Sequence, residues 1–257
     1  MKRFRRSEQS TARSVQFSFV GTRASAALYI RYINCTLPSD SCTLYKTLRF
    51  SLKRGIAVSS LQTVYQEMQA FFQPLWPGED KPLVLGEGKS DGPVLMLIGE
   101  APGETEVLKR RPFVGKAGKN LDEFLSLAQL RREDIFVSNV VKIRPAEIGP
   151  TGRMRNRAPN REELSLFTPW LLKEIQAVKP LALVTLGNVP LKALTNAKAS
   201  VGDCHGQWFS SQSGIPLFSL YHPASIIYRR ALAPVYEQDV LALRQSLVEK
   251  QTGAAAP

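Results

Sequence analysis

The chain has 257 residues, of which 44% are hydrophobic and 22% are charged, so it can bury a sizeable core and is not disordered throughout. No uncharged apolar stretch reaches the roughly 18 residues that a membrane-spanning helix needs. Three cysteines at irregular spacing are not typical of a disulfide-stabilised domain and indicate a reducing compartment.

Most of the net charge of +12 lies in the first 57 residues, which hold eleven Lys or Arg and two acidic residues, a charge of +9. The rest of the chain carries only +3, so the overall charge alone does not predict that it binds nucleic acid. The 1–57 segment is rich in Arg and Ser and shows no helical or strand period. It is expected to be a disordered tail, upstream sequence from a mis-assigned start, or a mitochondrial transit peptide. Cys35 and Cys42 within it do not form a convincing metal-ligand pair.

Helices and strands alternate along residues 58–250, the predicted domain, and residues 251–257 are expected to be a frayed tail. In chain order the patterns predict helix 61–72, strand 94–98, helix 117–127, strand 135–141, helix 160–179, strand 181–186, helix 189–194, strand 215–220 and helix 235–250. Asn160 and Glu163 form a capping-box pattern at the start of the longest central helix. This alternation predicts an α/β fold with a parallel sheet covered on both faces.

Polar or glycine-containing segments follow all four predicted strands. They are Gly99–Glu106, Asn139 with Lys142 and Arg144, Leu186–Asn188, and His222–Ser225. Each segment alone is explained by an ordinary turn. Because ligands bind beyond the carboxyl ends of parallel strands, their joint placement predicts a site at this edge of the sheet.

Six blocks of the sequence resemble the family 4 type of the uracil-DNA glycosylase superfamily. They are Gly99–Gly103, Arg111–Gly118, Asn139–Pro145, Asn156–Pro159, Leu186-Gly187 and His222–Ala224, in the order of that family and within residues 61–247. The resemblance implies a three-layer α/β/α sandwich around a four-stranded parallel sheet. It also implies a DNA-repair enzyme that flips uracil out of DNA and hydrolyses its N-glycosidic bond, leaving an abasic site. No lysine nucleophile for strand cleavage is evident.

Three other functions remain open. The first is a glycosylase of the same superfamily that removes another deaminated base, hypoxanthine or xanthine. The second is an inactive nucleic-acid-binding module. The third is a small-nucleotide hydrolase, which the absence of phosphate-loop and metal-carboxylate motifs disfavours.

The sequence departs from this family at its iron–sulfur cluster. Typical members carry four cysteine ligands, whereas Ile143 and Phe167 occupy two of those positions here and no Cys lies between Cys42 and Cys204. Thiolates hold such clusters, so no cluster, metal or other cofactor is expected. Apolar side chains, including Ile143, Phe167 and part of Phe71–Trp76, should fill the space, and Cys204 should be a lone buried thiol.

A second departure is an insertion of about eight residues, by comparison with the family pattern, within Ala146–Arg155. It ends in the basic stretch Gly152–Arg155 and is expected to be flexible.

The resemblance assigns roles to five side chains. Phe113 would stack on the flipped uracil, Asn139 would read its polar edge, and His222 would face its O2 as the base leaves. Glu106 would crowd C5 and exclude the methyl group of thymine, and Glu100 would either position water or only shape its loop. Gly99, Ala101, Pro102 and Gly103 would complete the substrate-binding loop. Each role has a structural alternative: core packing for Phe113, a strand-end cap for Asn139 and a solvated charge for Glu106.

On the DNA side, the expected contacts are Asn156, Arg157, Ser225, Ile226 and Arg229. Ile226 or Ile227 would fill the space left by the flipped base, while Arg229 and Arg230 are equally well explained as a solvated surface. The expected partner is uracil-containing DNA, without a membrane, and the protein is expected to be a monomer. The expected location is the cytoplasm of a bacterium, or the mitochondrion if residues 1–57 are a transit peptide.

Overall fold

A computed structural model describes residues 60–77, 80–195 and 200–252. The predicted N-terminal segment 1–57, with Cys35 and Cys42, lies outside the described residues, as does 253–257 of the predicted tail. None of the helices in the described part is both long and apolar enough to cross a membrane.

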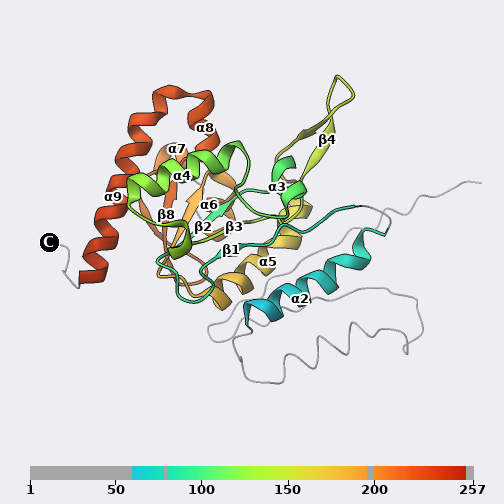
Figure 1. The fold of residues 1–257 in the computed structure, drawn as a ribbon, viewed down its shortest axis with the longest axis horizontal. Coiled ribbons are helices and arrows are strands. Elements are labelled where there is room, and N and C mark those ends of the chain that lie inside the picture. The colour runs from blue at the N-terminus through green and yellow to red at the C-terminus, as the bar shows by residue number, and fades with distance from the viewer. Residues whose placement is uncertain (1–59, 78–79, 196–199, 253–257) are drawn as a thin grey trace, which may run out of the picture. The chain divides into compact units, whose positions relative to one another are not determined.

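The domain is built on one six-stranded sheet in the order β1-β3-β2-β6-β8-β7 (Figure 1). Its strands are β1 (Glu87–Gly88), β2 (Leu95–Gly99), β3 (Phe136–Asn139), β6 (Ala182–Leu186), β7 (Trp208–Ser210) and β8 (Pro216–Leu220). The four predicted strands form the parallel centre of the sheet, β3-β2-β6-β8. Two short antiparallel edge strands, β1 beside β3 and β7 beside β8, extend it and make the sheet mixed.

The helices are α2 (Leu61–Phe72), α3 (Glu104–Lys109), α4 (Lys116–Ala128), α5 (Arg161–Val178), α6 (Asn188–Leu194), α7 (Val201–Cys204), α8 (Pro223–Tyr228) and α9 (Ala233–Thr252), with 3₁₀ turns at η1 (Gln73–Leu75), η2 (Arg132–Asp134) and η3 (Arg230–Leu232). The capping box at α5 is confirmed: the Asn160 side chain accepts from the Glu163 N–H, and the Glu163 carboxylate accepts from the Asn160 N–H, both at 2.8 Å. The short helices α3, α7 and α8 were not predicted. The helix α9 extends two residues into the predicted tail.

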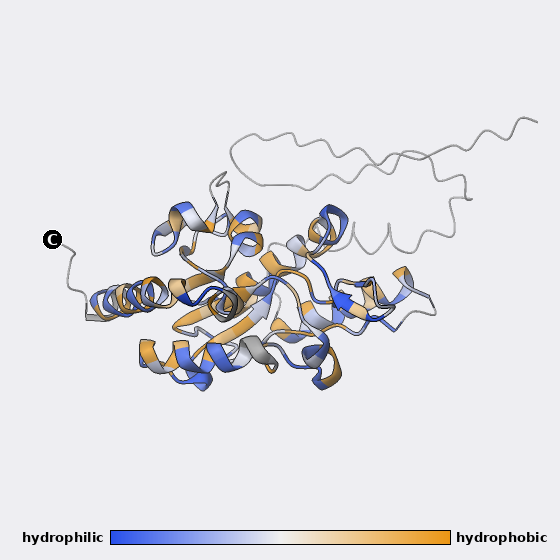
Figure 2. Ribbon diagram, turned by 90° about the horizontal axis from the view of Figure 1, so that it is seen from above, coloured by the Kyte–Doolittle hydropathy of each residue, from blue (hydrophilic) through white to orange (hydrophobic). Residues whose placement is uncertain are grey.

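Helices cover both faces of the sheet because alternate strand residues point to opposite sides. Met96 and Ile98 of β2 join one buried cluster with residues of α2, α5 and α6. Leu95 and Leu97 join a second cluster with residues of α4 and α9. Figure 2 shows the hydrophobic strands between helices that carry their hydrophilic residues outward. The three-layer α/β/α arrangement implied by the resemblance is therefore confirmed.

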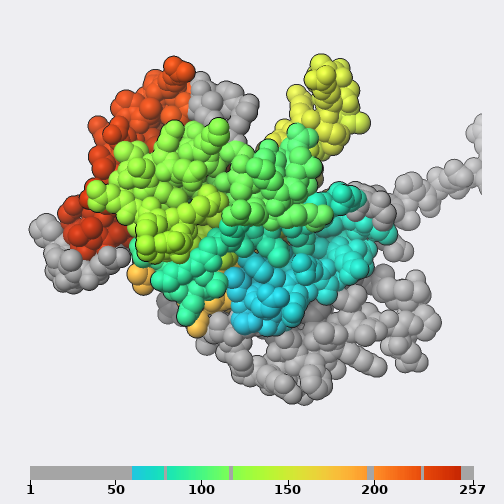
Figure 3. Space-filling view, in the orientation of Figure 1, coloured from blue at the N-terminus to red at the C-terminus, as the bar shows by residue number. Residues whose placement is uncertain are grey.

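The insertion at 146–155 is a β-hairpin rather than the flexible stretch expected from its composition. Its strands, β4 (Ala146–Ile148) and β5 (Met154–Asn156), pair antiparallel. Pro150 occupies the first corner of the turn and Gly152 has a left-handed φ of 75°, a combination that closes a three-residue hairpin loop. The Gly149 N–H donates to the Arg153 carbonyl at 2.8 Å. The hairpin stands out from the domain in the space-filling view (Figure 3).

Candidate active site

A hollow of about 220 Å³ lies at the carboxyl edge of the sheet. It is lined by Glu100, Ala101, Pro102, Pro145, Asn156, Arg157 and His222. Six of these seven residues were predicted site residues, all except Pro145. The seven residues come from the segments that follow β2, β3 and β8, and from the end of β5 with the residue after it. The prediction that the segments after the strands come together at one edge of the sheet is thus confirmed for these six residues.

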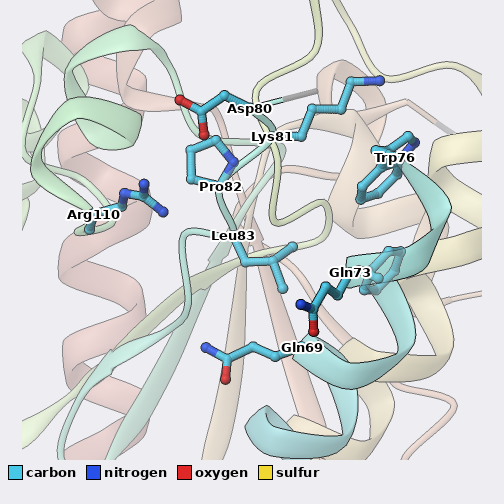
Figure 4. Close-up of a pocket in the computed structure, with 9 residues that line it drawn as sticks. Gln69, Gln73, Trp76, Asp80, Lys81, Pro82, Leu83 and Arg110 are labelled. Carbon is cyan, nitrogen blue, oxygen red and sulfur yellow. The ribbon is translucent and has the colours of Figure 1, made fainter. Parts of the chain in front are cut away.

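A second hollow, of about 460 Å³, lies beside α2 between Trp76 and Arg110 (Figure 4). None of the predicted site residues lines it. The candidate site is therefore the smaller hollow, where the strand ends meet.

Asn139 and Phe113 do not line the smaller hollow but meet at Gly99, the last residue of β2. A Cβ atom at Gly99 would overlap both the Oδ1 atom of Asn139 and the ring of Phe113. Both side chains are buried. Asn139 ends β3 directly beside Gly99, since the two residues are partners in the parallel register. Because Gly99 has no side chain, the Asn139 amide and the Phe113 ring can both pack against its backbone at the end of β2.

The backbone of Phe113 adopts a left-handed φ of 52°, which is uncommon for an aromatic residue. The Arg132 guanidinium donates to the carbonyl of the preceding Pro112 at 3.0 Å. Gly118 packs against the Phe113 carbonyl so closely that a Cβ there would overlap it. Strained backbone of this kind persists only where its surroundings hold it, and it concentrates at functional sites.

Glu106 on α3 ties together the two loops that carry the site. Its carboxylate accepts backbone N–H groups from Gly103 at 3.2 Å, Val114 at 3.1 Å and Gly115 at 2.7 Å. Gly103 belongs to the loop after β2, whereas Val114 and Gly115 directly follow Phe113. Glu106 thus positions Phe113 relative to the strand end, and its expected role against the C5 position remains a prediction.

His222 is neutral at ordinary pH and has a defined tautomer. Burial lowers the pKa of its imidazole to about 4. Its Nδ1 atom accepts a hydrogen bond from the Ala224 N–H at 3.1 Å, as part of the cap of α8. Since Nδ1 accepts, the ring proton is on Nε2, and His222 offers an N–H donor without carrying a charge. Gly187, with a φ of 91°, lies against its Cβ.

Glu100 lines the same hollow as His222. Burial raises the pKa of its carboxyl group. Among the described residues, no hydrogen-bond donor to this carboxylate is found. A carboxylate of this kind beside a neutral histidine is suited to accept a hydrogen bond from a water molecule.

The predicted DNA-side residues lie around this hollow or on the helix that follows it. Arg157 forms two hydrogen bonds of 2.7 Å to the Glu163 carboxylate, and the Asn156 Oδ1 atom accepts from Arg144 at 2.7 Å. Ser225 and Ile226 lie on α8, directly after His222, and Arg229 is exposed at its end. Ile226 packs partly against the second core cluster. The side chain of Ile227 lies outside the description.

Sequence reasoning missed a buried polar network that includes the backbone carbonyl of Asn139. The Lys142 ammonium donates to the Glu174 carboxylate at 2.6 Å and to the Asn139 carbonyl at 2.8 Å. The same carboxylate accepts from the hydroxyl groups of Ser138 at 2.8 Å and Tyr65 at 2.6 Å. A lysine inside an otherwise apolar run was the signal available in the sequence, but its partner is 32 residues away on α5.

The residues at the family's cluster positions do not fit an iron–sulfur cluster. Phe167 and Ile143 belong to the first apolar core cluster. The Phe72 ring stacks on Phe167 with centroids 4.3 Å apart and on Trp76 with centroids 5.2 Å apart. The apolar filling expected at these positions is thus present.

Nor do the remaining described residues offer cluster ligands. Cys204 is buried, and its thiol donates to the Ser200 carbonyl at 3.0 Å. Within the described ranges, no three His, Cys, Asp or Glu side chains are grouped so that they could hold a metal ion.

The fold and site define a three-layer α/β/α protein with an uncharged histidine, a buried amide and an aromatic ring near the carboxyl edge of its sheet. The family model described as "Uracil DNA glycosylase superfamily" matches residues 85–243. The chain belongs to this superfamily.

Curated relatives support the same placement. The "Type-4 uracil-DNA glycosylase" of Pyrobaculum aerophilum is 37% identical over 167 residues, covering 62% of this chain and 81% of the relative. The protein of that name from Saccharolobus solfataricus is 34% identical over 178 residues, covering 66% and 78%. A solved structure, wild-type Pedobacter heparinus SMUG2, aligns over 82% of this chain and 98% of its own, at 12% identity and a TM-score of 0.43.

Proposed function

We propose that this protein is a DNA-repair enzyme that hydrolyses the N-glycosidic bond of uracil in DNA, releasing uracil and leaving an abasic site. Membership of the superfamily and the name shared by its relatives support this activity. The observation that carries the proposal is His222, an uncharged histidine that lines the hollow and whose tautomer leaves Nε2–H as a donor.

The base must leave the helix before the bond is cleaved, because a base that is stacked and paired in a duplex cannot enter a protein pocket. We assign recognition of the flipped base to the two side chains that pack against Gly99. The Phe113 ring supplies a stacking surface and the Asn139 amide supplies one donor and one acceptor. Uracil offers an acceptor at O4 and a donor at N3, which matches that amide.

Bond cleavage creates a cationic sugar and an anionic base. Nε2–H of His222 donates to the uracil O2 atom and stabilises the charge that develops there. A neutral donor suits this step, since it does not have to give up a proton to the leaving base. Glu100 positions the water that attacks the sugar and accepts the proton that this water loses, and its negative charge favours the cationic carbon.

The test is to incubate the full chain with single- and double-stranded oligonucleotides that carry uracil, hypoxanthine or xanthine, and then to cleave abasic sites with hot alkali. We expect cleavage at uracil. His222→Ala should slow it by about 10²–10³-fold, the value typical of one such donor, while His205→Gln, which changes the other histidine, should not.

Cleavage only at hypoxanthine or xanthine would show a related glycosylase with another base preference. Binding without cleavage of any oligonucleotide would show a nucleic-acid-binding module. Either result would refute the proposed function.

A further inference from the structure

The β4–β5 hairpin, residues 146–156, is called the arm here because it stands out from the domain (Figures 1 and 3). Its register pairs Ala146 with Asn156, Glu147 with Arg155, and Ile148 with Met154. Side chains alternate along a strand. The pair next to the turn, Ile148 and Met154, which we call the outer pair, therefore shares one face with Ala146 and Asn156, the pair next to the domain. Glu147 and Arg155 lie on the other face.

The outer pair is apolar and exposed. Ile148 is 73% exposed and Met154 is 53% exposed, and the two side chains are direct cross-strand neighbours. Single exposed apolar residues are ordinary on a protein surface. Two that face each other on a projecting ribbon form a small apolar surface that the described domain leaves uncovered.

This apolar surface is continuous with the candidate active site. Asn156, on the same face of the arm, lines the hollow that holds His222 and Glu100. Met154 is two residues farther out, a rise of roughly 7 Å. Ile148 and Met154 are therefore within reach of the neighbouring units of a polymer whose one unit occupies the hollow.

The charges of the arm suit a polyanion. It carries Arg153 and Arg155 against a single acid, Glu147, which pairs with Arg155 at 2.7 Å. Arg153 is exposed and forms no ion pair with another described residue. A phosphate at this place would be neutralised by Arg153 without breaking an existing pair.

The arm is also built to hold its shape. Its turn is closed by the bonds from Gly149 to Arg153 and from Gly152 to Gly149, at 2.8 and 3.0 Å. At its base, the Arg157 N–H donates to the Pro145 carbonyl at 3.1 Å, and Arg144 donates to the Asn156 side chain at 2.7 Å. Such an element binds a ligand without first having to be ordered.

We propose that the arm is a duplex-binding element that lies against double-stranded DNA beside the flipped nucleotide. Ile148 and Met154 pack on the apolar faces that flipping uncovers in the neighbouring base pairs, and Arg153 contacts a phosphate. From Asn156 to the turn, the ribbon rises roughly 13 Å, comparable to the roughly 12 Å width of a major groove, so it reaches the opposite strand. This inference rests on the proposed function, because it takes DNA as the substrate.

The test compares the full-length parent with the double variant Ile148→Ser/Met154→Ser. Its matched control, Leu181→Ser/Leu241→Ser, changes two exposed apolar residues elsewhere, of which Leu181 precedes β6 at the opposite edge of the sheet. Binding is measured by fluorescence anisotropy on a duplex and on a single strand, each carrying a tetrahydrofuran abasic-site analogue. The arm variant should bind the duplex about tenfold more weakly and the single strand as the parent does. The control should match the parent on both.

Equal duplex binding by parent and arm variant would overturn the inference, and so would an equal loss on both probes or a parent that binds neither. The arm would instead bind a second copy of the chain if the parent were a dimer and the arm variant a monomer with the same DNA affinity. Failure of the proposed function looks different: the parent would release no uracil, while the arm-dependent duplex binding would still be measured. Equal single-strand binding also shows that the variant is folded.

Discussion

The ammonium group of Lys142 lies 2.6 Å from a carboxylate oxygen of Glu174, and neither side chain is exposed to solvent. Burial lowers the pKa of Lys142, and the adjacent Glu174 opposes that shift. Lys142 also donates to the carbonyl of Asn139. The pair thus joins α5 to the strand end that carries the proposed base-reading amide.

Removing one partner of this pair should strongly destabilise the domain. In Lys142→Met, Glu174 would be left as a buried charge with only hydroxyl partners, which typically costs about 3–5 kcal/mol. The free energy of unfolding in urea measures this cost. Lys142→Met/Glu174→Gln removes both charges and should recover part of the loss.

Lys173→Met is the control for that measurement. Lys173 adjoins Glu174 in sequence, but its ammonium is exposed and pairs with the exposed Glu67 at 3.0 Å. An exposed pair of this kind contributes at most about 1 kcal/mol. Equal losses of stability in the two single variants would contradict a special role for the buried pair.

His222 should remain neutral over the range in which most histidines titrate. Its pKa is about 4 in the folded domain, against an ordinary value near 6.5. The unfolded chain takes up this proton near pH 6.5 and the folded domain only near 4. The contribution of His222 to stability is therefore complete above pH 6.5 and is lost as the pH falls toward 4.

Proton NMR checks this directly, because the chain has only two histidines. A spectrum of His205→Gln assigns the ring resonance of His222, which should keep its chemical shift between pH 8 and pH 5. A midpoint near 6.5 for this resonance, in a folded protein, would refute the neutral-donor assignment.

Gly99→Ala should impair excision more than it impairs folding. The added methyl group would overlap the Asn139 amide and the Phe113 ring, so both must shift. Overpacking of this kind costs about 1–3 kcal/mol of stability, whereas misplacing substrate-positioning groups by an ångström costs about 10²-fold in rate. Single-turnover excision and thermal unfolding, measured side by side, separate the two effects.

Gly202→Ala is the matched control, since a Cβ there meets only ordinary contacts of 3.4 Å or more. A parental excision rate in Gly99→Ala would show that the placement of Asn139 and Phe113 against Gly99 does not matter for recognition of the base.

The sequence predicted the centre of the fold because burial leaves strong patterns there. The run of five buried residues in β6 is too short and too apolar for a surface helix. The capping-box pattern of Asn160 and Glu163 indicates where α5 begins. The edge strand β1 has two residues and no pattern of its own. The arm was missed because its three-residue strands mix apolar and charged residues, although Pro150 and Gly152 carried the turn signal.

The site was predictable only in part. His222 and Asn139 each follow from their places at strand ends. That Asn139 and Phe113 meet over Gly99, away from the hollow, depends on how the loop around Glu106 is held by backbone hydrogen bonds. The partnership of Lys142 with Glu174 joins residues far apart in the chain, and no local pattern encodes it.

The most specific prediction concerns Asn139→Asp. The parental amide can donate to the uracil O4 atom and accept from its N3–H, whereas cytosine presents a donor at N4 and an acceptor at N3. Against cytosine, the amide would leave buried groups unmatched, at about 1–3 kcal/mol for each. A carboxylate removes the donor to O4 and supplies an acceptor for the N4 amine. We therefore expect uracil excision to fall steeply in Asn139→Asp and the uracil-to-cytosine ratio of single-turnover rates to fall with it. The assay uses matched oligonucleotides at saturating enzyme, with Asn156→Asp as the control for a change of charge at the rim of the hollow. If Asn139→Asp is folded and its ratio equals that of the parent, Asn139 does not read the edge of the base.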